Sequence, residues 1–79
     1  MNYEDIVKAL PKDVADTLQA ELDNVNITDT MSQDEVRELA EDAVKLTRLK
    51  VVIADDEKRR LVDTLLTFVA NSVVGVVFA

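Results

Sequence analysis

The chain contains a single glycine, Gly75, and a single proline, Pro11, among its 79 residues. These two residue types make the tight turns that join short strands, so a β-rich fold would lack the turns it needs. Apolar residues recur instead at intervals of three and four, which is the period of an α-helix. The sequence therefore predicts an all-α fold, a small helical hairpin or bundle of three to four helices with a strongly apolar C-terminal helix.

The length predicts one helical domain, residues 1–79, because a typical domain is about twice as long. Within it we distinguish acidic amphipathic helices at residues 1–60 from an apolar association helix at residues 61–79. A chain this short buries only about 60% of its unfolded surface, and it has no cysteine to form a disulfide. We therefore expect the fold to gain stability by oligomerising or by packing in a larger complex.

Two helices are predicted in the N-terminal part of the chain. Asn2 stands ahead of Glu4 and Asp5, a cap followed by acids that suit the positive end of a helix dipole. This helix should end near Leu10, because Pro11 disfavours helix for the residue before it and fits the first turn of a second helix. The expected core stripe of the second helix consists of Val14, Leu18, Leu22 and Val25.

A third helix is predicted after a polar loop at residues 24–32. Ser32 and Glu35 form a capping box, and we expect the helix to run to about Ala54. Asp55 and Asp56 can cap a further helix, although the pattern also fits one continuous helix; we favour a break. The expected core stripe of the third helix consists of Val36, Leu39, Ala43, Leu46 and Ile53, widened by Ala40, Val44 and Leu49 and interrupted by Lys50.

The chain becomes far more apolar from Leu61 onward. On a helical wheel its few polar or small residues fall on one side, which favours a helix. A strand is the alternative for residues 72–79, because valines are strand formers and Gly75 costs a helix interior about 1 kcal/mol. The residues of the polar stripe are Asp63, Thr64, Thr67, Asn71, Ser72 and Gly75.

The apolar surplus of this C-terminal segment predicts a contact with a second copy or with another protein. Small side chains every four residues, at Thr67, Asn71, Gly75 and Ala79, would let another helix approach closely. A solvent-facing stripe explains them equally well. The predicted interface residues are Leu61, Leu65, Phe68, Val69, Val73, Gly75, Val76 and Phe78.

A tail anchor in a membrane is the alternative function for the same segment. The uncharged run at residues 64–79 follows Lys58, Arg59 and Arg60, as in a helix whose positive flank stays in the cytoplasm. The run spans roughly 24 Å, which is short of the ~30 Å hydrocarbon core. A longer span would bury Asp63 at a cost of about 3 kcal/mol. Burial against protein is therefore favoured over contact with lipid.

Catalysis is not expected, because the chain has neither histidine nor cysteine. Imidazole bases, thiol nucleophiles and the common zinc, haem and iron–sulfur ligands are thereby missing. Asn24, Asn26, Thr28 and Glu35 fall at ligand positions of an EF-hand loop, but Asp29 stands where that loop needs glycine. We therefore predict a non-enzymatic protein with no catalytic residue, no cofactor and no metal.

The net charge of −7 would repel a nucleic acid backbone, so no nucleic acid partner is expected. A further alternative function is an acidic inhibitor that imitates nucleic acid, supported by the acids of the third helix. Glu4 and Asp5 stand where a secretory signal would carry cations and an apolar run. We therefore expect a protein that is not secreted and acts in the cytoplasm or within a large assembly, for example a virus or phage particle.

Overall fold

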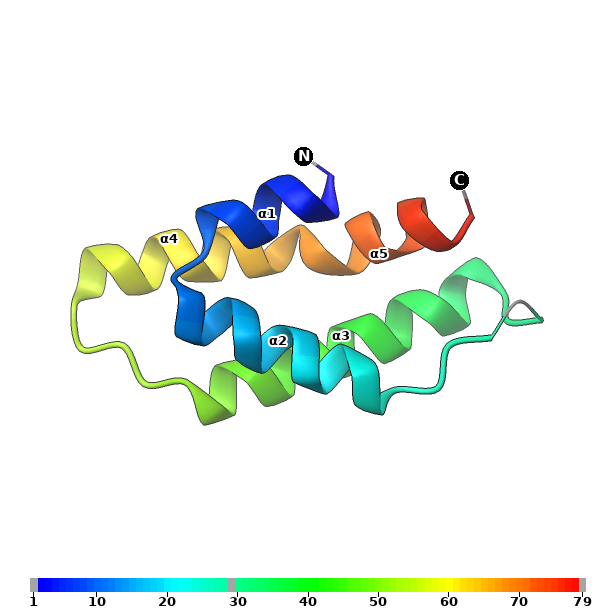
Figure 1. The fold of residues 1–79 in the computed structure, drawn as a ribbon, viewed down its shortest axis with the longest axis horizontal. Helices are drawn as coiled ribbons and strands as arrows, with labels where there is room; N and C mark the ends of the chain where they lie inside the picture. The colour runs from blue at the N-terminus through cyan, green and yellow to red at the C-terminus, as the bar shows by residue number, and fades with distance from the viewer. Residues whose placement is uncertain (1, 29, 79) are drawn as a thin grey trace.

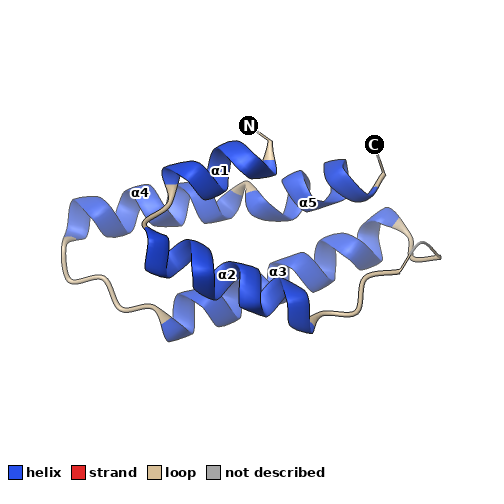
Figure 2. Ribbon diagram, viewed as in Figure 1, coloured by secondary structure: helices blue, strands red, loops and turns tan. Residues whose placement is uncertain are grey.

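A computed structural model describes residues 2–28 and 30–78, and this part of the chain is helical and without strands (Figures 1 and 2). The all-α prediction is thereby confirmed. The helices are α1 (Tyr3–Ala9), α2 (Lys12–Asn24), α3 (Gln33–Lys50), α4 (Asp56–Thr67) and α5 (Val69–Val77).

Helices α4 and α5 are almost continuous and form one rod, here called the α4–α5 rod (Figure 1). Phe68 alone separates them, and its φ of −87° and ψ of −8° remain in the helical region. Its N–H donates to the carbonyl of Leu65 at 3.1 Å, a bond one residue shorter than in an α-helix. The rod continues through Val77, which confirms helix over strand in the described part of residues 72–79.

The helices pack as a small elongated bundle with principal extents of 40 × 22 × 17 Å. Helix α3 packs most extensively on α5 and on α2, while α1 lies against both α5 and α4. The rod runs antiparallel to α3, and the two chain ends lie on the same side of the molecule (Figure 1). Every helix therefore contributes one side to a shared interior.

The core is a single cluster that draws side chains from all of these helices. Helix α3 contributes small residues to it, including Ala40 and Ala43, both with no exposed surface. Small side chains at a helix contact let the neighbouring backbones approach closely. The least exposed large side chains of the core are Ile6, Leu18, Leu66, Val14, Val36 and Val69.

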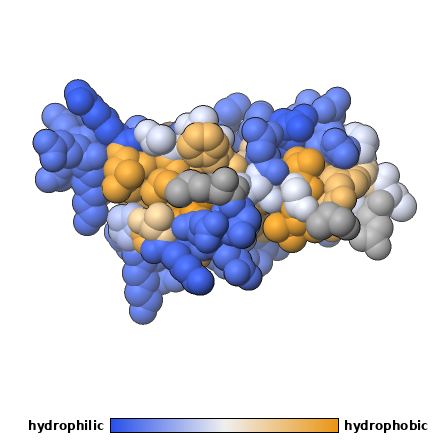
Figure 3. Space-filling view, turned by 90° about the horizontal axis from the view of Figure 1, so that it is seen from above, coloured by the Kyte–Doolittle hydropathy of each residue, from blue (hydrophilic) through white to orange (hydrophobic). Residues whose placement is uncertain are grey.

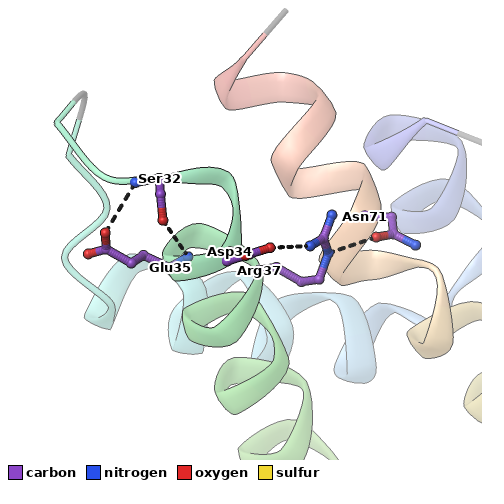
Figure 4. A network of polar contacts seen from close by, with 5 residues as sticks. All are labelled: Ser32, Asp34, Glu35, Arg37 and Asn71. Carbon is purple, nitrogen blue, oxygen red and sulfur yellow. Dashed lines mark hydrogen bonds and ion pairs between the residues drawn. The ribbon is translucent and has the colours of Figure 1, made fainter.

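The predicted helix caps are present. The Asn2 side chain accepts a hydrogen bond from the Asp5 N–H at 2.9 Å. At the start of α3 the Glu35 N–H donates to Ser32 Oγ at 3.2 Å, and the Ser32 N–H donates to Glu35 Oε1 at 3.4 Å (Figure 4). Asp55 caps α4 by accepting from the Lys58 N–H at 2.9 Å. Side chains thus satisfy donors that a helix start leaves free.

Two predicted helix boundaries were wrong. Pro11 is the N-cap of α2, with ψ of 147°, and the helix itself begins at Lys12. Helix α3 ends at Lys50 rather than near Ala54, because the next residues are β-branched and extended. Val51 and Ile53 turn toward the core, while Val52 between them is 91% exposed. This alternation is the period of an extended chain.

The predicted core stripe of α3 was also displaced. Leu46 is 42% exposed and Leu49 is 79% exposed, whereas Thr47 is fully buried. Because α3 contacts both α2 and α5, its buried face is centred between them rather than on the leucines. The Thr47 hydroxyl donates to the Ala43 carbonyl at 2.8 Å, so its burial leaves no unsatisfied donor.

In α2 the predicted stripe is buried at Val14 and Leu18 but only half-buried at Leu22. The buried place next to Leu22 belongs to Glu21, whose side chain is 5% exposed. Its carboxylate accepts a hydrogen bond from Lys50 Nζ at the end of α3. This ion pair explains the polar position in the α3 stripe, since Lys50 provides the counter-charge for a buried carboxylate.

Candidate association surface

The predicted interface residues of the α4–α5 rod divide into a buried set and an exposed set. Leu65, Val69 and Val73 are buried in the chain's own core. The other predicted residues remain exposed: Leu61 at 56%, Phe68 at 48%, Val76 at 64%, Phe78 at 40%, and Gly75. Only this second set is free to contact another molecule.

Leu61, Phe68 and Gly75 follow one another at intervals of seven residues, and we call them the rod face. An interval of seven places side chains in one line along a helix, with a slight drift that a partner helix follows by supercoiling. Figure 3 shows hydrophobic areas over the α1, α4 and α5 side of the molecule, next to a strongly hydrophilic end where α4 begins. The rod face therefore repeats at one of the two heptad positions that a helix–helix seam uses.

Gly75 lies in the middle of α5 with open space around it. A Cβ atom added there would meet no atom within 4 Å, so nothing in the chain itself requires a glycine. Thr67 and Asn71 of the predicted small-residue ridge are exposed as well, and Ala79 lies outside the described residues. The ridge is therefore exposed at Thr67 and Gly75, while Asn71 is contacted by Arg37 of α3.

Polar contacts flank the rod on the side of α3. Arg37 donates through Nη1 to Asp34 at 2.9 Å and through Nε to Asn71 Oδ1 at 3.2 Å (Figure 4). Further along α3, Arg48 forms an ion pair with Asp63, with Nε and Oδ1 3.6 Å apart. These pairs are exposed and stabilise the fold by about 1 kcal/mol or less each. They place the start of α3 beside α5 and its end beside α4.

An apolar hollow of about 210 Å³ lies where α1, α2 and α5 meet, lined by Leu22, Ile27, Val73 and Val76. At its rim the Tyr3 hydroxyl donates to Gln19 Oε1 at 2.9 Å, and Gln19 Nε2 donates to Asp23 Oδ1 at 2.9 Å. Burial raises the pKa of Tyr3, and the negative charge of Asp23 raises it further. The hollow is open to solvent and adjoins the exposed Val76.

A second exposed apolar group lies on α3 and the segment after it, formed by Leu46, Leu49 and Val52. Sequence reasoning placed both leucines in the core and so missed this group. The signal that could have located it is Thr47 beside them, whose hydroxyl can bond to the preceding turn and leave a small residue on the core side.

The described residues contain no group of three or more acidic side chains placed to hold a metal ion. By length and composition the 22-residue segment Asp56–Val77 is a helix able to cross a membrane, since an 18-residue stretch of it has a mean hydropathy of 1.5, and 44% of that stretch is buried inside the fold. Core helices of soluble proteins pass the same test. No protein-family model matches the chain, and neither a curated protein nor a solved structure is detectably similar to it.

Proposed function

We propose that this protein is a non-enzymatic assembly component that binds a second copy or another protein through the rod face. The observation that carries the proposal is the exposure of Leu61 and Phe68, seven residues apart on the same rod whose other side forms the core. Single exposed apolar residues are common on soluble proteins, whereas an aligned set marks a contact surface.

The energetics support the same function. Fully burying a leucine or phenylalanine side chain stabilises a protein by about 1.5–3 kcal/mol, and Leu61 and Phe68 each leave about half of that surface in water. A domain of this size has only a small stability margin of its own. Covering the rod face would add stability that the isolated chain lacks.

Removing the whole C-terminal segment is a poor test of this function. Truncation after Arg60 would remove Leu66 and Val69, both at most 2% exposed in the core. The shortened chain would lose its fold and its association together. Substitutions confined to exposed positions separate the two effects.

The test uses Leu61→Gln combined with Phe68→Gln. The matched control is Leu46→Gln combined with Leu49→Gln, since it removes exposed apolar side chains from α3. Native mass is measured by sedimentation for the purified chain and for the chain isolated, with any bound partner, from the organism that makes it. We expect the rod-face variant to lose association with unchanged helicity by circular dichroism, and the control to associate normally. Equal association by both variants in both samples would overturn the proposal.

A membrane anchor is a second candidate function, supported by the length and hydropathy of Asp56–Val77. It predicts that the full chain partitions into detergent. The protein-interface proposal predicts a chain that stays in the aqueous phase. Phase separation in a mild detergent decides between them.

A further inference from the structure

The side-chain sizes of the rod face make it complementary to a second, antiparallel copy of itself. Leu61 precedes Phe68 by seven residues and Gly75 follows it by seven, so a bulky side chain and an open gap lie at equal distances on either side. If two such rods pack antiparallel around Phe68, Leu61 of each copy lies opposite Gly75 of the other. Large residues opposite small ones interdigitate without voids, and Gly75 has the free space this requires.

The polar residues within the same seam are suited to being covered. Thr64 and Ser72 lie four residues before and after Phe68, so an antiparallel pair also brings them together. The Thr64 hydroxyl donates to the Arg60 carbonyl and the Ser72 hydroxyl to the Phe68 carbonyl, each at 2.8 Å. Covering them therefore leaves neither hydroxyl donor without a partner.

Charge is unevenly distributed along the bundle, mainly through α3 beside the rod, and this favours one direction of packing. The start of α3 beside α5 is acidic, while the end of α3 and the first turns of α4 carry most of the cations. A parallel pair would place two acidic halves side by side, where like charges repel. The acids at the start of α3 are Asp34, Glu35, Glu38, Glu41 and Asp42, which outnumber Arg37, and the cations of the α4 half are Lys45, Arg48, Lys50, Lys58, Arg59 and Arg60, which outnumber Asp55, Asp56, Glu57 and Asp63.

We propose that the rod face is covered by the same face of a second copy, in an antiparallel two-fold dimer whose axis passes beside Phe68. The same surface patch is then used on both subunits, and the two Phe68 rings meet at the axis, where aromatic pairs add stability. This inference rests on the proposed function and identifies the partner that the proposed function leaves open.

The decisive experiment exchanges the large and the small residue. Gly75→Leu should weaken dimerisation about ten- to a hundred-fold by overpacking against Leu61 of the other copy, and Leu61→Ala should weaken it by removing contact. Combining Leu61→Ala with Gly75→Leu restores a large residue opposite a small one in the antiparallel dimer. We expect the double variant to dimerise more tightly than either single variant, as measured by sedimentation equilibrium.

Packing direction is read independently from cysteine pairing, since the chain has no cysteine of its own. Thr64→Cys and Ser72→Cys chains are mixed and oxidised under native conditions. In the antiparallel dimer, disulfides that join position 64 of one chain to position 72 of the other should be more frequent than under random pairing. Oxidation of a denatured mixture gives the random frequency. Like residues would be about 12 Å apart along the axis, beyond the reach of a disulfide.

Three results would overturn this inference. They are a double variant no tighter than the single variants, disulfides that join like residues, and a purified wild-type chain that stays monomeric. A monomeric purified chain would still be consistent with the proposed function if the chain isolated from the organism that makes it is bound to a partner that the Leu61→Gln, Phe68→Gln variant does not bind. If the isolated variant keeps that partner, both the dimer and the proposed function are wrong.

Discussion

The two sides of the α4–α5 rod both carry apolar residues, but in opposite surroundings. One side places Leu66 and Val69 in the core at 2% and 0% exposure, while the other leaves Leu61 and Phe68 about half exposed among polar residues such as Thr64. Hydropathy averaged along the sequence does not separate these apolar residues, because they alternate within the same stretch. The difference arises only from where α1 and α3 pack, since those helices cover one side of the rod.

The difference between the two sides should be greatest for leucine-to-alanine substitutions. Leu66→Ala removes a side chain from a packed interior and should lower the free energy of unfolding by about 2–5 kcal/mol. Leu61→Ala removes a half-exposed side chain and should change the free energy of unfolding of the monomer by about 0.5 kcal/mol or less. Urea unfolding of the two variants measures both values, and equal losses would contradict the assignment of the two sides.

The sequence predicted the features that depend on neighbouring residues. The capping box of Ser32 and Glu35 and the caps at Asn2 and Asp55 involve contacts three residues apart, so their chemistry can be read locally. Helix from Leu61 onward also followed from periodicity alone. The sequence likewise identified residues from Leu61 onward as the most apolar segment.

Features that depend on tertiary packing could not be predicted in the same way. Leu46 and Leu49 have the spacing of a core stripe, but α3 is turned so that Thr47 faces inward between its two neighbours. The Glu21 carboxylate is buried because Lys50, far away in sequence, reaches it. Tertiary packing also divides the predicted interface residues between core and surface, because apolar residues that follow one another along the helix point to different sides of the rod.

A substitution outside the rod should lower the stability of the whole fold without changing association through the rod face. Ser32→Ala removes the hydroxyl that accepts from the Glu35 N–H and should lower the free energy of unfolding by about 1 kcal/mol. Association between folded chains should be unchanged, because Ser32 lies outside the rod. Thermal melting and sedimentation of the same sample test the two statements. An unchanged melting midpoint would mean that the cap contributes nothing.

Gly75 offers a gain of stability on the exposed side. It lies inside α5 without a positive φ and with open space around it, so Gly75→Ala should stabilise the isolated chain by about 0.5–1 kcal/mol through a lower loss of backbone entropy. A matched Ser72→Ala variant shows how much a small substitution in the same helix changes stability by itself. A destabilised Gly75→Ala chain would show that this side of the rod is covered within the monomer.

The smallest effect concerns Tyr3, which lies where the buried side of the rod meets the exposed Val76. Burial raises the pKa of Tyr3 above its ordinary value of 10.0, and Asp23 raises it further. The folded chain therefore holds the phenol proton more tightly than the unfolded chain does. This contribution to stability is fully present below pH 10 and is lost as the pH rises through the pKa of the folded state.

Tyr3 is the only tyrosine and the chain has no tryptophan, so tyrosinate absorbance reports this residue alone. We expect the absorbance of the folded chain to rise at higher pH than that of the chain in denaturant. A Tyr3→Phe variant serves as the control, because the part of the alkaline stability loss caused by tyrosine should be absent from it. If the folded and denatured chains titrate together, α1 does not pack against α5, and the side of the rod now described as buried is open at that end.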